Sequence, residues 1–223
     1  MKTRSFVPAL VALAACNTNG FGPSFEGEVT MTTTRAGVPP MTTTMTIKAK
    51  GDKVRLEMPS PMGGTMSALY EPKENKLVLL MDAQKTAMDM NLGAPGAPQP
   101  NTDGRTSAID RTGKRETIAG IGCEDWIVKD PGGSRTEVCV AEGLPFIDLD
   151  ALRHVATSSW KADLRAKKTF PLRSVEYDKD GKELSRAEVT SVKREKLSDS
   201  LFEVPEGYAR MPRAPSGGHG GPM

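Results

Sequence analysis

The sequence is poor in the side chains on which most catalytic and metal sites depend. Its 223 residues include two histidines, three cysteines and only 5% aromatic residues. It also lacks the Gly-x-Ser-x-Gly, His-Glu-x-x-His and phosphate-loop patterns of common hydrolases, zinc proteases and nucleotide-binding enzymes. We therefore expect a protein that is not an enzyme and that carries no cofactor or metal.

Strong charge of one sign is missing as well. Thirty basic residues oppose 28 acidic ones, which gives a formal net charge of +2, and no run of lysine and arginine stands out. A nucleic-acid partner is not expected, because such a surface needs clustered basic side chains. Long hydrophobic runs are lacking too. The apolar stretch at 6–15 is about half as long as the roughly 20 residues that a helix needs to cross a bilayer.

The start of the chain does carry the pattern of an export signal. Lys2 and Arg4 precede the apolar stretch, which ends in Leu13-Ala14-Ala15-Cys16. These last four residues resemble the bacterial lipobox, in which a signal peptidase cleaves before a cysteine that carries diacylglycerol. An ordinary secretory signal followed by an unmodified cysteine is the alternative.

The lipobox resemblance predicts a signal peptide over 1–15, a lipidated linker over 16–24, and a membrane attachment through Cys16. Two or three acyl chains on one residue hold a protein stably on a bilayer. Asn17, which follows the cysteine, resembles the pattern of lipoproteins delivered to the outer membrane. We expect a lipid-anchored protein of the bacterial cell envelope that faces the periplasm.

The two remaining cysteines, Cys123 and Cys139, form an even pair in an oxidising compartment. They belong to two strand-like runs that flank a strong turn signal, Asp130-Pro131-Gly132-Gly133-Ser134. A hairpin would bring the two side chains close together. The sequence therefore predicts a Cys123–Cys139 disulfide.

Alternation of apolar and polar residues dominates from Phe25 onward, and short connectors separate the runs. This pattern predicts a mainly β domain over 25–211, built on a single strongly curved antiparallel sheet that forms a half-open barrel. One main helix is expected at about 148–160, on the concave face of the sheet. The Gly- and Pro-rich loop at 91–104 and the 212–223 tail are expected to be exposed, and the tail disordered.

Four sequence pieces in the carboxyl half resemble a known family: Thr117–Glu124, Glu137–Val140, Phe170–Arg173 and Ser200–Tyr208. They are similar to a domain family of unknown function from bacterial periplasmic proteins and lipoproteins. That family is in turn similar to the LolA/LolB-like group of lipoprotein carriers, whose fold is a half-open antiparallel barrel plugged by helices. The resemblance implies a fold and indicates no catalytic signature.

Methionine is concentrated in the amino half, where nine of twelve methionines lie between Met31 and Met90. Methionine suits surfaces that must accept varied apolar partners. One hypothesis is therefore an apolar ligand, such as an acyl chain, held between sheet and helix by Met31, Met45, Met58, Leu79, Met81, Met88, Leu152 and Trp160. A filled core that acts through an envelope protein partner is the alternative, and copper binding by Met88 and Met90 is a weaker one.

Overall fold

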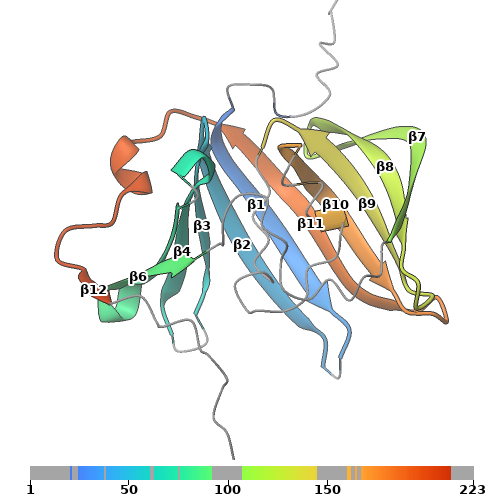
Figure 1. Ribbon diagram of the computed structural model, residues 1–223, viewed down its shortest axis with the longest axis horizontal. Coiled ribbons are helices and arrows are strands. Elements are labelled where there is room, and N and C mark those ends of the chain that lie inside the picture. The colour runs from blue at the N-terminus through green and yellow to red at the C-terminus, as the bar shows by residue number, and fades with distance from the viewer. Residues whose placement is uncertain are drawn as a thin grey trace, which may run out of the picture.

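The computed structural model describes residues 21, 25–37, 39–60, 63–74, 76–91, 107–144, 160–161, 164 and 167–211. These residues form one twelve-stranded sheet (Figure 1). Its strands are β1 (Glu26–Arg35), β2 (Met41–Lys50), β3 (Lys53–Pro59), β4 (Thr65–Glu71), β5 (Lys76–Met81), β6 (Thr86–Asn91), β7 (Ala108–Ile118), β8 (Ile121–Lys129), β9 (Arg135–Glu142), β10 (Thr169–Tyr177), β11 (Glu183–Arg194) and β12 (Ala209–Met211).

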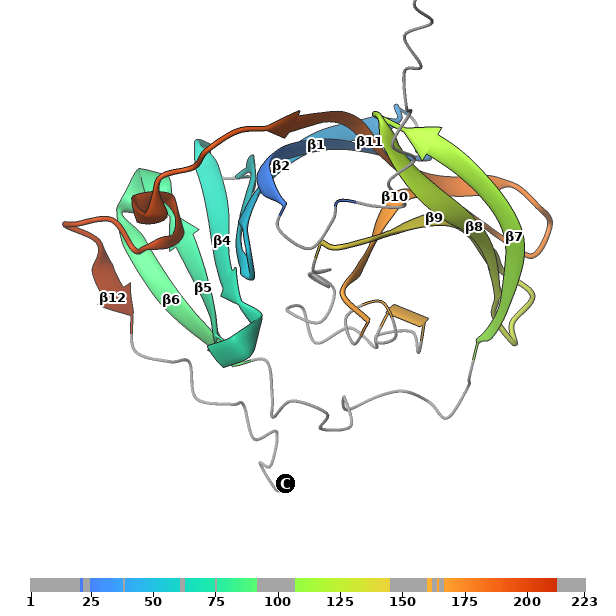
Figure 2. The same ribbon diagram turned by 90° about the horizontal axis from the view of Figure 1, so that it is seen from above.

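The sheet is open, because its two edge strands are not paired with each other. The spatial order is β12-β6-β5-β4-β3-β2-β1-β11-β10-β9-β8-β7, and only the β12–β6 pair is parallel. Seen from above, the sheet is strongly curved (Figure 2). The expected single, curved and open antiparallel sheet is therefore confirmed.

The expected helix at about 148–160 is not supported. Residues 148–159 lie outside the described residues, and only Trp160 of this stretch is described, in a short helical turn with Lys161. Within the described ranges, the complete helices are three short 3-10 turns: η1 (Pro72–Glu74), η2 (Asp82–Gln84) and η4 (Asp199–Phe202). Apolar spacing is a weak indicator of a helix, because tertiary packing routinely overrides it.

Several other predictions also fall outside the described residues. These are the signal peptide, the Cys16 anchor, most of the 91–104 loop, and the 212–223 tail. They stay predictions. In the part of the chain that the structure describes, no helix has the length and hydrophobicity needed to cross a membrane.

The sequence predicts that strands resume at Arg115 after the Gly- and Pro-rich loop, whereas the observed strand β7 begins seven residues earlier, at Ala108. Its first half, Ala108–Lys114, is polar and contains a glycine, so it shows little apolar alternation. The pairing with β8 shifts register between Arg111 and Arg115, which marks a bulge. Charged side chains and a bulge are common on edge strands, where they discourage pairing with other chains.

The turn between β7 and β8 contains only Ala119 and Gly120, because Ile118 pairs directly with Ile121. Both turn residues have positive φ, 48° for Ala119 and 81° for Gly120. This conformation matches the right-handed twist of the flanking strands and favours glycine or asparagine. The glycine of the Ala-Gly-x-x-Cys-Glu motif therefore has a backbone role.

Residues 195–211, the C-terminal segment, run from β11 past β3 to the far edge of the sheet, where β12 joins β6 (Figure 1). Val204 and Tyr208 pack on a small apolar cluster of Leu69, Val78, Leu80 and Ala87. The Tyr208 hydroxyl donates a hydrogen bond to Asp82 at 2.9 Å, and Arg55 donates one to the Leu201 carbonyl at 3.2 Å. The terminal Phe-x-Val-Pro-x-Gly-Tyr motif is thus a covering element of the sheet.

Candidate functional site

A row of methionines crosses five neighbouring strands on one face of the sheet. Met31 pairs with Met45, Met58 pairs with Met66, and Met66 pairs with Met81. Met45 and Met58 lie one position beyond the last residue pair of β2 and β3, Thr46 with Glu57. Because residues opposite each other on paired strands share a face, these five side chains form one continuous strip, here called the methionine row.

The methionine row lies at the margin of a packed core. Neighbouring residues of the same face, such as Val29, Ile47 and Leu56, are at most 2% exposed. Met31 is buried, whereas the four other methionines of the row are only partly buried. Met45 and Met58 pack against the core cluster, as does Leu79. One end of this face is therefore a buried core, and the methionine side chains beside that core are partly exposed.

The structure brings together most of the residues predicted to line an apolar site. Met31, Met45, Met58, Leu79 and Met81 share the face, and Met88 pairs with Leu79 in the adjoining position of β6. Leu152 lies outside the described residues. Trp160 is described but belongs to a second apolar cluster with Trp126 and its neighbours.

Sequence reasoning did not assign Met66, Met90 or Trp126 to the site. Met66 completes the methionine row, and Met90 packs against the same core as Met58. The alternation of residues within 65–71 indicates that Met66 lies on the apolar face of its strand. The sequence contains no comparable signal for Trp126, because the pairing of β1 with the distant β11 places Trp126 on this face.

Trp126 shares a face with residues next to the methionine row. A series of directly paired residues leads across the sheet from Thr33 through Ala187, Ser174 and Val138 to Trp126. Thr33 lies two positions after Met31 in β1, so it points to the same side. Trp126 is buried with Val128, Val138, Val140, Trp160 and Leu164. The face thus holds two apolar regions, one rich in methionine and one centred on Trp126.

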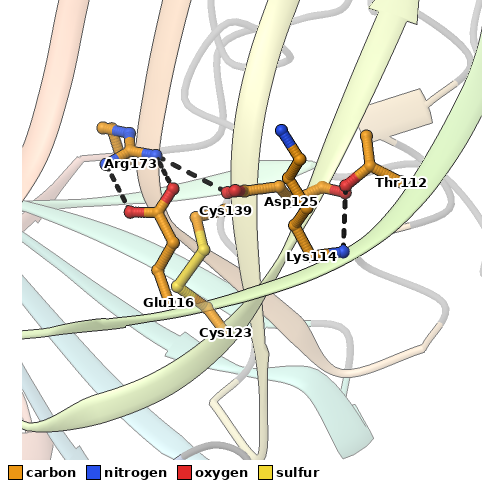
Figure 3. Close-up of a disulfide and its surroundings, with 7 residues drawn as sticks. All are labelled: Thr112, Lys114, Glu116, Cys123, Asp125, Cys139 and Arg173. Carbon is orange, nitrogen blue, oxygen red and sulfur yellow. Dashed lines mark hydrogen bonds and ion pairs between the residues drawn. A yellow bond between two sulfur atoms is a disulfide. The ribbon is translucent and has the colours of Figure 1, made fainter.

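The predicted disulfide is confirmed: Cys123 and Cys139 are joined, with their Cα atoms 5.4 Å apart. Around it lies a charged cluster contributed by β7, β8 and β10 (Figure 3). Arg173 donates to Glu116 at 2.8 Å, and its guanidinium lies 3.5 Å from the Asp125 carboxylate.

The two carboxyl groups of this cluster have opposite electrostatic environments. Hydrogen bonding to Arg173 lowers the pKa of Glu116. Burial raises the pKa of Asp125 to about 6, and the neighbouring Glu116 carboxylate adds to the effect. Below about pH 6, down to the lowered pKa of Glu116, the pair therefore favours an ionised Glu116 and a protonated Asp125.

Glu116, Asp125 and Cys139 place possible ligand atoms within 4.8 Å of one another, but this group is a poor metal site. The Cys139 sulfur is bonded to Cys123 and offers no thiolate. The two remaining carboxylates already face the positive charge of Arg173. The cluster is better explained as support for the β7–β10 part of the sheet.

A pocket of about 340 Å³ lies between β3–β5 and the C-terminal segment. Its lining includes Leu69 and Val78, which alternate with Tyr70 and Leu77 and so face away from the methionine row. Lys53, Lys76, Glu71, Glu203 and Arg210 also line it. This pocket contains none of the predicted lining residues and is too rich in charge to suit an acyl chain.

The architecture is that of a β-sheet protein with one open, curved sheet. The chain belongs to the family described as domain of unknown function DUF4412, whose model matches residues 25–208. The resemblance to a family of unknown function is thereby confirmed. No curated protein matches the sequence.

Several solved structures are similar in fold. An uncharacterized conserved protein from Thermus thermophilus is 12% identical with a TM-score of 0.47, over 83% of this chain and 90% of that one. The MucA/MucB complex of Pseudomonas aeruginosa matches at 14% identity and a TM-score of 0.45, over 81% and 56%. The LolA superfamily protein NE2245 from Nitrosomonas europaea matches at 12% identity and 0.37, over 82% and 91%. At these scores the similarities assign no function.

Proposed function

We propose that this protein is a non-enzymatic binding protein of the bacterial envelope that holds an apolar ligand, such as an acyl chain, on the methionine row. The observation that supports the proposal is the row itself: five methionines in register on adjacent strands, four of them only partly buried. Flexible thioether side chains can adjust to chains of different length and shape.

Burial of a ligand on this strip supplies the binding free energy. Removing apolar surface from water contributes roughly 25 cal/mol per Å². Covering the exposed part of several methionines, together with the ligand's own surface, therefore contributes favourably to binding. The second half of the proposal is a lipid anchor at Cys16, supported by the lipobox pattern, and an outer-membrane location facing the periplasm, supported by Asn17 after the cysteine.

The test uses the full chain with Cys16→Ser, so that no attached acyl group is mistaken for a bound one. Native mass spectrometry and a titration with palmitate measure binding, first without and then with Met66→Glu. We expect at least a tenfold loss of affinity, because a carboxylate in the row would have to be desolvated by the ligand.

Met41→Glu is the matched control, because Met41 lies on β2 but is 62% exposed at the hairpin end. It makes the same chemical change outside the row and should leave binding unchanged. Circular dichroism checks that both variants fold. If palmitate and extracted envelope lipids do not bind the Cys16→Ser chain at all, the proposal is wrong. The packed-core alternative, in which the protein acts through a protein partner, would then be preferred.

A further inference from the structure

The indole N–H group of Trp126 is a buried hydrogen-bond donor that has no acceptor within the described part of the chain. Its side chain is 5% exposed, and its indole Nε1 is the one buried side-chain nitrogen or oxygen without a partner among the described residues. Buried indole N–H groups usually find an acceptor. An exception costs stability and calls for an explanation in terms of function or of a missing partner.

The surroundings of this N–H group are apolar on the protein side. Val128, Val138, Val140, Trp160 and Leu164 surround Trp126, and all are at most 5% exposed. The cluster lies on the same face as the methionine row, as the paired series from Thr33 to Trp126 shows. The two apolar regions therefore lie on one face of the sheet, where β11, β10 and β9 separate the strand of Met31 from that of Trp126.

A positive charge is present beside the indole. Arg111 pairs with Trp126 across β7 and β8, and its guanidinium carbon lies 4.6 Å from the centre of the indole ring. Arg111 itself is exposed, so it can turn toward an anion that approaches the ring. A hydrogen-bond donor beside a cation suits a negatively charged or strongly polar oxygen.

We propose that Trp126 is the polar anchor of the ligand site: its indole N–H donates a hydrogen bond to a carboxylate or ester oxygen of an acyl compound. This inference rests on the proposed function and narrows it. The acyl chain lies along the methionine row, the oxygen is held at Trp126, and Arg111 favours a carboxylate. The site would then prefer acyl compounds to plain hydrocarbons.

The test compares palmitate with diphenylhexatriene, a hydrocarbon fluorophore that has no oxygen acceptor, in the Cys16→Ser chain. Trp126→Phe should weaken palmitate binding about tenfold and change diphenylhexatriene binding less than twofold. Trp160→Phe is the matched control, since it removes the other indole of the same cluster. It should change the affinity for both probes by the same factor.

A second measurement leaves Trp126 in place. In the Trp160→Phe protein, Trp126 is the remaining tryptophan, and its emission should shift to the red with palmitate but not with diphenylhexatriene. The inference is overturned if Trp126→Phe leaves palmitate affinity unchanged, or if it weakens both probes alike. If neither palmitate nor diphenylhexatriene binds the Cys16→Ser chain, the proposed function itself is wrong. That outcome differs from one in which palmitate binds and Trp126→Phe has no effect, which overturns only the role of Trp126.

Discussion

Replacing Asp125 by asparagine should stabilise the protein at pH 8 and have a much smaller effect at pH 4. Asp125 is 21% exposed and lies beside Glu116 and Arg173 near the disulfide. Burial and the Glu116 carboxylate raise its pKa to about 6, against an ordinary value of 3.8. The folded chain therefore binds this proton more tightly than the unfolded chain does.

The sign of the pH dependence follows from that difference. The stability contributed by the protonated carboxyl is fully present below about pH 4, and it is lost as the pH rises through about 6. One unit of pKa corresponds to about 1.4 kcal/mol, so a rise of roughly two units sets an upper limit of about 3 kcal/mol. Because solvent reaches part of the carboxyl group, we expect a gain of about 1–2 kcal/mol for Asp125→Asn at pH 8.

Urea unfolding followed by circular dichroism at pH 4 and pH 8 measures this gain as the difference in free energy of unfolding. Asp180→Asn is the control, since Asp180 is 71% exposed in the β10–β11 turn and should change stability by less than about 0.5 kcal/mol. The reasoning fails if Asp125→Asn is not more stable than the parent at pH 8. An equal gain at both pH values would also contradict it.

Two further predictions concern the β7–β9 region. Ala119→Gly should raise the free energy of unfolding by about 0.5 kcal/mol, because Ala119 has a φ of 48°. Gly120→Ala should lower the free energy of unfolding by about 1 kcal/mol, because it places a side chain at a positive φ. Thermal melts of both variants should show these opposite signs. Replacing Cys123 and Cys139 together by serine should cost about 3 kcal/mol, given their separation of 16 residues. A melting temperature within about 2 °C of the parent under oxidising conditions would refute that value.

The local part of the fold could be predicted from the sequence because strand periodicity is a local property. For example, the sequence predicts a strand over 65–71, and the structure has β4 there. Where alternation is weak, as in the first half of β7, the prediction missed the strand. Apolar spacing at 148–160 predicted a helix that the described residues do not support, because spacing alone does not specify what packs on it.

The sequence by itself determined which kinds of side chain are available. It has no catalytic signature, it carries a cysteine pair on two adjacent strand-like runs, and it places methionines in alternating phase between Met31 and Met90. Only the tertiary structure decided how these are arranged. Pairing register aligned five methionines into one row, and the long-range pairing of β1 with β11 extended the same face through β10 and β9 to Trp126 on β8. The register of each pair depends on contacts between strands, and the β1–β11 pairing joins segments about 160 residues apart, so the alternation within one strand does not encode this arrangement.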